Sequence, residues 1–284
     1  MRTCFPSLLE SESEHGSLIR AMRARKAEGR RAAAGDALPS AFTTLRDGVG
    51  SLIDALVDAL RVMGAELRFG TSVMKLKPTE AGERLHLEGG GMIEAAHVAF
   101  AGPAHLPAKL LGDEWTDSFA MFRYASAATV FLAYDQAQLG RPLNGLGFVV
   151  PKHEGRAVTA CTWVSSKWEG RAPEGKALVR LFFGGPSGQH WLEQSDAALV
   201  HAARLEFEHF VGAAGAPELV RVQRFVRATP GAPFGHLDRV VALRGRLRAE
   251  RPRVHVLGNG YDGTGISDCI RQAGETATRL RENL

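Results

Sequence analysis

Cysteine is scarce in this sequence. Only Cys4, Cys161 and Cys269 occur among 284 residues, and their spacing matches neither a metal site nor a redox pair. Three is also an odd number, so we interpret all of them as free thiols in a reducing compartment. The cysteines therefore indicate a cytoplasmic protein.

Long apolar runs are missing too. No run reaches the roughly 18 residues that a membrane-spanning helix needs, and the first residues lack the apolar region of a signal peptide. Hydrophobic residues make up 45% and charged residues 23% of the sequence, a balance typical of globular proteins. The length allows one large domain or two ordinary ones.

Signatures of hydrolytic chemistry do not occur. We find neither the H-E-x-x-H of zinc proteases nor the G-x-S-x-G of serine hydrolases. Two Glu-x-x-His pairs, Glu12 with His15 and Glu206 with His209, match part of a di-iron site. Such a site needs two further carboxylates in a four-helix bundle, whereas this chain is rich in strand patterns. We therefore expect no metal and assign both pairs to surface or capping roles.

The net charge is weakly positive, +4 with a pI of about 9.1. This suits an anionic cofactor, an acidic substrate or an acidic membrane surface without choosing among them, and nothing indicates a nucleic acid. Basic residues concentrate between Arg20 and Arg31, in an alanine-rich run that ends at Gly35-Asp36. We interpret this run as a solvated loop or frayed helix, with attraction to anionic lipid headgroups as the functional alternative.

The most informative stretch is residues 254–270, V-H-V-L-G-N-G-Y-D-G-T-G-I-S-D-C-I. The apolar start, residues 254–257, predicts a buried strand. Four glycines in eight residues then let the backbone approach a planar or anionic ligand. A helix with Ser267 as its N-cap is expected next, and its free N–H groups would favour negative charge. Its apolar period is carried by Ile266, Ile270, Ala273, Ala277 and Leu280.

Residues 258–263 also spell G-x-G-x-x-G, the pattern of a dinucleotide fingerprint. That fingerprint needs a following strand and an acidic residue about 20 positions on, but the sequence ends after one predicted helix. Taken alone, the match is as consistent with a structural glycine turn as with a nucleotide site.

The run from Gly258 to Ile270 resembles the carboxy-terminal flavin motif of the FAD-dependent protoporphyrinogen oxidases, with Ser267 in place of the usual proline. In that family the loop and helix start lie along the isoalloxazine ring, where a helix N-terminus favours the anionic reduced flavin. The resemblance implies FAD as the cofactor. The residues that it places at the flavin are Gly258, Asn259, Gly260, Tyr261, Gly265, Ile266 and Ser267.

A second flavin-related pattern begins at Phe42. We predict a helix that starts with a capping box at Ser51 and Asp54 and ends at Gly64. Strands should follow around Leu67 and Phe69 and from Gly70, with a hairpin partner at residues 85–87 across a turn at 79–82. The pattern resembles flavin amine oxidase-like enzymes, in which the backbone at the position of Val73 meets adenine. A buried strand at 98–104 should close over the cofactor at Ala101, Gly102 and Pro103.

Residues 105–245 are dominated by strand patterns, at 128–134, 147–150, 158–164 and 177–183, with an amphipathic helix at 194–211. This predicts an antiparallel sheet. Residues 161–185, which include Arg171-Ala-Pro, resemble a run specific to protoporphyrinogen oxidases, and residues 223–236 resemble another. The second run departs from the family at Phe225 and at Gly231-Ala232. The resemblance implies that Val149, Trp163 and Phe182 line a flat tetrapyrrole site, whereas the residues alone would make Trp163 and Phe182 core.

The predicted fold class is mixed α+β and α/β: an incomplete FAD-binding, Rossmann-like domain and an antiparallel-sheet substrate domain. We expect the end of a helical membrane-docking lobe at 1–38, FAD-binding segments at 39–104 and 250–284, and the substrate domain at 105–249. The resemblance begins roughly 40% of the way into a family member. The amino-terminal FAD-binding half is therefore expected to be missing from this chain.

The implied function is the FAD-dependent oxidation of protoporphyrinogen IX to protoporphyrin IX in haem biosynthesis, with oxygen as the acceptor and no catalytic base that we can name. Oxidation of coproporphyrinogen III or a non-catalytic remnant are the alternatives. Another amine oxidase or a carotenoid desaturase would share residues 48–73 but lack Arg171-Ala-Pro. The implied partners are the porphyrinogen, the cytoplasmic membrane surface and a second copy in a homodimer. By itself the chain is expected to be colourless and inactive.

Overall fold

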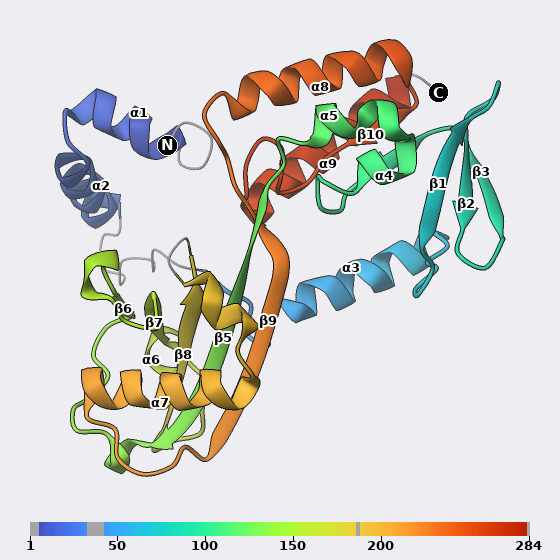
Figure 1. Cartoon of the computed structure of the whole chain (residues 1–284). Helices are drawn as coiled ribbons and strands as arrows, with labels where there is room; N and C mark the ends of the chain where they lie inside the picture. The colour runs from blue at the N-terminus through green and yellow to red at the C-terminus, as the bar shows by residue number, and fades with distance from the viewer. Residues whose placement is uncertain (1–5, 33–42, 186–187, 283–284) are drawn as a thin grey trace. The chain divides into compact units, whose positions relative to one another are not determined.

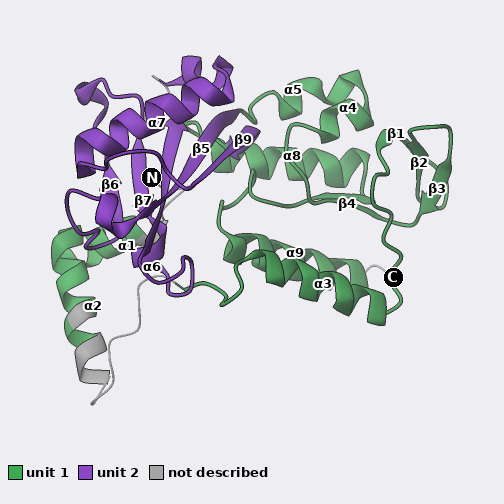
Figure 2. Ribbon diagram, turned by 90° about the horizontal axis from the view of Figure 1, so that it is seen from below, with its two compact units in different colours: residues 1–123, 230–284 green, residues 124–229 purple. Residues whose placement is uncertain are grey.

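The computed structural model describes residues 6–32, 43–185 and 188–282 (Figure 1). The chain divides into two compact units, which Figure 2 colours separately. The first unit comprises residues 1–123 and 230–284, and the second unit comprises residues 124–229.

The second unit is built on a five-stranded sheet with the strand order β6-β7-β8-β5-β9. Strand β8 is therefore the middle strand, and it pairs antiparallel with both β5 and β7, as β6 does with β7. This confirms the antiparallel sheet predicted from the strand patterns. The strands are β5 (Tyr124–Asp135), β6 (Gly147–Val149), β7 (Ala160–Trp163), β8 (Lys176–Gly184) and β9 (Leu219–Pro230).

One face of this sheet packs against helix α7 (Asp196–Val211) to form the core of the second unit. Alternate residues of β5 and β8 supply that core, because successive side chains of a strand point to opposite faces. Helix α7 begins where Ser195 Oγ accepts the N–H of Ala198 at 3.2 Å, and it ends at Gly212, whose φ is 75°. The core residues are Ala128, Val130, Leu132, Tyr134, Val179, Leu181, Phe183, Leu199, Ala203 and Phe207.

The first unit holds a three-stranded antiparallel sheet, β1-β2-β3, and a parallel pair, β4 with β10. Its strands are β1 (Val73–Pro78), β2 (Glu83–Leu87), β3 (Met92–Ala95), β4 (Val98–Phe100) and β10 (Val254–Val256). Its helices are α1 (Pro6–His15), α2 (Leu18–Ala32), α3 (Gly50–Val62), α4 (Pro107–Leu111), α5 (Thr116–Phe119), α8 (His236–Glu250) and α9 (Ile266–Glu282).

The hairpin predicted in the first unit is present. Leu76 of β1 lies opposite Leu85 of β2, and the Thr79 N–H donates to the Gly82 carbonyl at 2.9 Å across the turn. The strand predicted around Leu67 and Phe69 is wrong, because residues 65–72 form turns and irregular structure. Gly64 and Gly70 bracket this segment with φ values of 81° and 64°. Such left-handed positions favour turns over extended backbone.

Helix α3 differs from the prediction in how it begins and in what its apolar side contacts. It begins at Gly50, and the Ser51 hydroxyl donates to the Gly48 carbonyl at 2.7 Å, so the expected capping box does not form. Within the part of the chain that the structure describes, no residue of α3 is buried, and Leu56 is 51% exposed. Apolar residues of this helix such as Ile53 and Leu56 are thus largely exposed.

The sheet-rich unit is shorter than the predicted segment 105–249, because α4, α5 and α8 belong to the first unit. The reason lies in the aromatic residues next to the boundary. The Phe122 ring packs edge-on against Tyr261, with ring centroids 5.1 Å apart, and against His236 at 5.7 Å. This packing joins the residues just before β5 to the glycine-rich loop after β10.

A buried ion pair ties the three-stranded sheet to the start of β10. Arg251 Nε lies 3.1 Å from Glu83 Oε1, and Arg251 Nη2 lies 2.5 Å from Glu83 Oε2. Both side chains are buried, and Glu83 opens β2. The bidentate geometry satisfies both charges, which a buried ion pair requires.

Helix α2 forms where a solvated loop or frayed helix was predicted. Ile19 and Met22, three residues apart, are both largely exposed, as are Arg20 and Arg23. Across the described ranges of the chain, the helices all fall short of the length and apolarity needed to cross a bilayer.

Candidate functional site

The glycine-rich loop is placed by the parallel pair of strands β4 and β10. Val254 lies opposite Val98 and Val256 opposite Phe100, and the Leu257 N–H extends the pairing to the Phe100 carbonyl at 3.0 Å. Because both strands run in the same direction, the segments that follow them leave at the same edge of the sheet. Ligands of parallel sheets bind beyond the carboxyl ends of the strands. The pairing thus brings Ala101 and Gly102 beside Gly258.

Gly258 opens the loop in a conformation that requires glycine. Its φ is 125°, and a Cβ at this position would lie 3.3 Å from the carbonyl oxygen of Ala101. The side-chain amide of Gln272 binds both polar groups of its backbone: the Gly258 N–H donates to Oε1 at 3.1 Å, and Nε2 donates to the Gly258 carbonyl at 3.2 Å. These two hydrogen bonds therefore hold the first residue of the loop in place.

Gln272 belongs to α9, a helix whose buried residues are polar. Gln272 and Thr276 are the buried residues of the helix, whereas Ile266 and Ile270 are 55% and 64% exposed. The apolar period thus correctly predicted a helix, but two residues of that period are exposed. Sequence reasoning missed Gln272 because a polar residue on a helix is expected to face solvent.

The start of α9 also differs from the prediction. The helix begins at Ile266, and Asp268 Oδ2 accepts the N–H of Gly265 at 3.0 Å, so Asp268 supplies the capping interaction and Ser267 lies inside the first turn. A Cβ at Gly263 would lie 2.3 Å from Asp268 Cγ. Residues 264–267 are all exposed. The helix start therefore offers free N–H groups and a partial positive charge at the surface.

Tyr261 lies beneath the loop rather than on its surface. Its side chain is buried, its ring packs on Phe122, and its carbonyl accepts a hydrogen bond from His236 Nε2 at 2.8 Å. Arg244 lies over the ring, with its guanidinium carbon 5.8 Å from the centroid. Tyr261 therefore supports the loop from below, while the exposed positions above are Gly265, Ile266 and Ser267.

These residues fit a flavin. A positive-φ glycine in close contact with the Ala101 carbonyl, a second glycine that excludes a side chain at 263, and an exposed helix start together form a surface that a flat, electron-accepting ring can approach. Val73 belongs to the same unit, at the start of β1 opposite Leu87. Its expected role at adenine stays a prediction.

Two histidines lie behind the loop, one just before β4 and one within β10. His97 Nδ1 and His255 Nε2 are 3.2 Å apart, and their ring centroids are 5.4 Å apart. Burial lowers the pKa of His255, and the charges of His97 and Arg279 lower it further. The sheet that carries the loop thus contains a histidine that disfavours protonation.

The predicted tetrapyrrole residues do not share one face of the sheet. Val149 lies opposite Ala160, and Ala160 lies opposite Phe182, so Val149 and Phe182 point to the same side. Trp163 lies opposite Val179 and is buried in the core with it. The structure thus brings two of the three together and places Trp163 on the side of α7.

We use the term outer face for the side of the sheet opposite to α7, which carries Thr129, Phe131, Val149, Thr162, Arg180 and Phe182. Arg180 was missed by sequence reasoning, although it lies within the run that resembles the family. Its guanidinium carbon is 4.6 Å from the centroid of the Phe182 ring and 5.7 Å from that of Phe131. Burial lowers the pKa of Arg180.

Glu206, one of the residues considered for a di-iron pair, has a structural role. Its Oε2 accepts a hydrogen bond from Arg156 Nε at 2.8 Å, and its Oε1 accepts the N–H of Ala157 at 3.0 Å. His209 packs edge-on against Phe210. Glu206 is buried, so the surface role predicted for it is wrong, whereas His209 is exposed as predicted.

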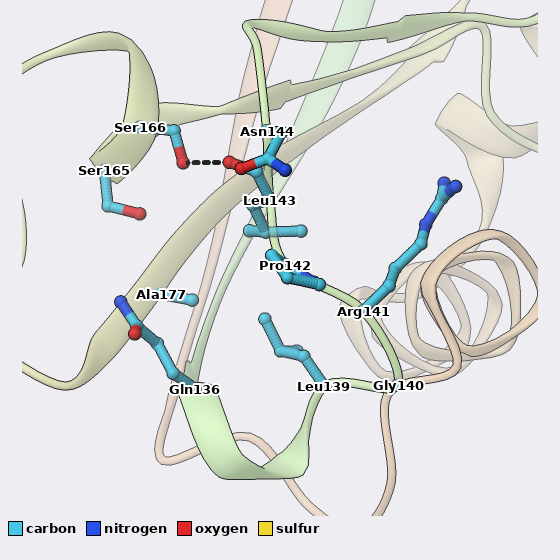
Figure 3. A pocket seen from close by; sticks show the side chains of 10 residues that line it. All are labelled: Gln136, Leu139, Gly140, Arg141, Pro142, Leu143, Asn144, Ser165, Ser166 and Ala177. Carbon is cyan, nitrogen blue, oxygen red and sulfur yellow. Dashed lines mark hydrogen bonds between the residues drawn. The ribbon is translucent and has the colours of Figure 1, made fainter.

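The second unit also has a cavity of about 410 Å³ (Figure 3). Leu139 and Leu143 supply apolar surface, and Gln136, Arg141 and Asn144 supply polar groups. The Ser166 hydroxyl donates to the Leu143 carbonyl at 2.8 Å and closes one side. The residues that line this cavity do not include Val149, Trp163 or Phe182, so it is separate from the predicted tetrapyrrole site.

Comparison with known families and proteins gives a consistent result. The model of the family described as flavin containing amine oxidoreductase matches residues 1–281. The coproporphyrinogen III oxidase of Bacillus subtilis (strain 168) is 28% identical over 96% of this chain and 58% of its own length. That of Propionibacterium freudenreichii is 31% identical over 97% and 56%. The protoporphyrinogen oxidase of Homo sapiens is 26% identical over 99% and 61%.

Solved structures of flavin-family proteins also resemble this chain. A protein from Exiguobacterium sp. 255-15, assigned as a protoporphyrinogen oxidase, superposes with a TM-score of 0.83 at 28% identity, covering 99% of this chain and 58% of its own. Reduced UDP-galactopyranose mutase shares the fold, with a TM-score of 0.58 at 12% identity over 86% of this chain and 52% of its own. This chain thus spans little more than half the length of the proteins that it matches.

Proposed function

Because this chain belongs to the flavin-containing amine oxidoreductase family, we propose that it takes part in the flavin-dependent oxidation of a porphyrinogen to a porphyrin. The predicted cofactor, FAD, is confirmed at the level of the family, which is a flavin-containing one. Relatives named coproporphyrinogen III oxidase and relatives named protoporphyrinogen oxidase both support a porphyrinogen as the substrate.

The relatives favour coproporphyrinogen III over protoporphyrinogen IX, which was the first prediction from the sequence. Six relatives named for coproporphyrinogen III are 28–33% identical to this chain. The protoporphyrinogen oxidases of Bos taurus and Homo sapiens are 26% identical, and the Exiguobacterium protein is 28% identical. We therefore propose coproporphyrinogen III as the substrate to test first, with protoporphyrinogen IX as the second.

The observation that supports the flavin site most strongly is the position of the glycine-rich loop. The loop starts at the carboxyl edge of a parallel strand pair, fixed by Gln272, and ends at the exposed start of α9. When bound there, FAD would supply the capacity to accept electrons from the substrate. The N–H groups and dipole of α9 would stabilise negative charge at that place, and Gly258 and Gly265 would keep side chains out of the way.

The outer face of the second unit supports binding of a flat, apolar macrocycle. Phe131 and Phe182 lie on neighbouring strands, and Val149, which is 80% exposed, belongs to the same face. Aromatic and branched side chains on a sheet provide a flat contact surface with little loss of side-chain entropy on binding. The chain would thus hold the substrate by the second unit and the cofactor by the first.

We also propose peripheral contact with anionic membranes through α2. Ile19 and Met22 could insert between lipid headgroups while Arg20 and Arg23 lie near the phosphates, the arrangement of an interfacial amphipathic helix. Contact of this kind would bring the chain close to an apolar substrate. Sedimentation with vesicles of anionic lipid tests it, and binding that Arg20→Glu with Arg23→Glu does not weaken contradicts it.

Turnover of the two porphyrinogens tests the function. The chain is expressed alone and together with a second polypeptide, the part of the Bacillus subtilis relative that it does not match. Each preparation is mixed with coproporphyrinogen III or protoporphyrinogen IX in the presence of oxygen. We expect porphyrin fluorescence to rise faster than spontaneous oxidation in at least the co-expressed preparation. Rates equal to spontaneous oxidation with both substrates would contradict the proposal.

A further inference from the structure

Arg180 occupies the middle of the outer face. It belongs to β8, the central strand of the sheet, and lies opposite Phe131 of β5 and Thr162 of β7. Its side chain extends along the face, over the ring of Phe182. A cation therefore lies at the centre of a face whose other named residues are aromatic, aliphatic or threonine.

Two other half-buried arginines of the second unit have carboxylate partners. Arg156 binds Glu206 at 2.8 Å, and Arg224 binds Asp196 at 2.7 Å. Arg180 differs from both: among the described residues no carboxylate lies within ion-pair distance, and its buried Nε has no hydrogen-bond partner there. Its contacts with two aromatic rings are the main interactions that offset the cost of burying its charge.

Burying a guanidinium without a partner costs free energy unless an anion binds to it. Its planar fork of N–H donors matches a carboxylate, which it can bind through two parallel hydrogen bonds. A second polar group on this face also lacks a hydrogen-bond partner among the described residues. The hydroxyl of Thr129, opposite Phe182 in the sheet, is buried and has no hydrogen-bond partner within the described part of the chain.

We propose that Arg180 binds a side-chain carboxylate of the tetrapyrrole substrate while the rings of Phe131 and Phe182 contact the macrocycle. This inference rests on the proposed function, which it deepens by naming a residue that recognises the acid groups. Each porphyrinogen carries propionate side chains on an apolar ring, four in coproporphyrinogen and two in protoporphyrinogen. The guanidinium of the outer face complements the negative charge of the propionates, and its aromatic rings complement the apolar macrocycle.

Binding of a stable porphyrin and of its neutral ester tests this inference. The ligands are coproporphyrin III and its tetramethyl ester, titrated in the same dilute detergent and followed by porphyrin fluorescence. The proteins are the 284-residue chain, Arg180→Met, which removes the charge, and Arg180→Lys, which keeps it. Arg204→Met is the matched control, because Arg204 is exposed on α7, on the other side of the sheet.

We expect Arg180→Met to weaken binding of the free acid by roughly 10- to 100-fold, the range of a hydrogen bond to a charged group. Binding of the ester should change by less than about 3-fold in the same variant, because the ester offers no charge for the guanidinium to pair with. Arg180→Lys should bind the acid with intermediate affinity, and Arg204→Met should bind it like the unaltered chain.

Equal binding of the acid by Arg180→Met and the unaltered chain would overturn the role of Arg180 and leave the proposed function standing. If Arg180→Met does not fold, the affinities for the free acid and for the ester are compared in the unaltered chain and in Arg180→Lys. Equal affinities for acid and ester would overturn the inference. Binding of neither porphyrin by the unaltered chain would contradict the proposed function itself.

Discussion

The side-chain amide of Gln272 and the backbone of Gly258 are joined by two hydrogen bonds, of 3.1 and 3.2 Å. Fourteen residues separate them in the sequence, and both are buried. The amide thus supplies the partner of the buried Gly258 N–H, and it shares the Gly258 carbonyl with the N–H of Tyr261, which donates at 3.3 Å. This side chain therefore helps to fix the start of the glycine-rich loop.

Replacing Gln272 should therefore affect both stability and flavin binding. In Gln272→Leu the buried N–H of Gly258 loses its partner, whereas the Gly258 carbonyl keeps the hydrogen bond from the Tyr261 N–H. We expect a free energy of unfolding lower by about 1–3 kcal/mol in urea titrations, together with weaker FAD binding. Thr278→Leu, on the exposed side of the same helix, is the control and should change stability by less than about 0.5 kcal/mol. Equal stability of the two variants would show that the amide is dispensable.

Gly265→Val separates folding from flavin binding. A Cβ at Gly265 would lie 3.2 Å from Asp268 Oδ2 and 3.6 Å from Ser267 Oγ, and the backbone there is not left-handed, so the fold should tolerate the change. The branched side chain would project from the exposed loop where the flavin ring is expected. The co-expressed preparation should lose its bound FAD, measured by flavin absorbance, while its melting temperature stays within a few degrees. Gly274→Ala, in an open part of α9, is the control and should keep its flavin. Retention of flavin by Gly265→Val would show that the loop does not contact the flavin.

The Arg251–Glu83 pair should be needed for the first unit to fold. Arg251→Met leaves the Glu83 carboxylate buried without its partner, at a cost of about 3–5 kcal/mol. The double variant Arg251→Met with Glu83→Gln should recover part of that loss, since no charge is left buried. Chemical denaturation of the two single variants and the double variant measures the coupling. Strictly additive losses would mean that the two side chains do not act as a pair.

Acid should destabilise the sheet that carries the loop. The pKa of His255 is lowered by burial, so the unfolded chain takes up a proton at a pH where the folded chain does not. Stability from this residue is therefore present above the ordinary histidine pKa and is lost as the pH falls from that value through the lowered folded value. We expect His255→Asn to reduce this loss, measured by thermal unfolding from pH 7.5 to about pH 5. An unchanged pH profile would exclude His255 as the source.

Local patterns predicted much of the fold. Alternation along residues 128–134 and 177–183 predicted β5 and β8, and the turn at 79–82 predicted the β1–β2 hairpin. The glycine-rich loop between β10 and α9 was likewise predicted, because glycine density and a change from strand to helix period are signals that a short segment carries by itself. These features depend on neighbours in the sequence.

Features that depend on distant neighbours could not be predicted. Whether Trp163 or Phe182 faces the core depends on the register of β7 against β8, which only the assembled sheet fixes. Gln272 is buried because Gly258 offers two polar groups, and Asp268 rather than Ser267 caps α9 because the turn at Gly265 brings its N–H to that carboxylate. Arg180 became visible only once its aromatic neighbours on two strands were known.

The most direct test of the account is a single-turnover reaction without oxygen. The co-expressed preparation, loaded with FAD, is mixed anaerobically with coproporphyrinogen III while flavin absorbance and porphyrin fluorescence are recorded together. We expect the absorbance of the oxidised flavin to fall without oxygen, because one flavin accepts two of the six electrons that a porphyrinogen loses on its way to a porphyrin. Admitting oxygen should restore the oxidised flavin and allow the porphyrin fluorescence to rise. A flavin that remains oxidised in the presence of the porphyrinogen would contradict it.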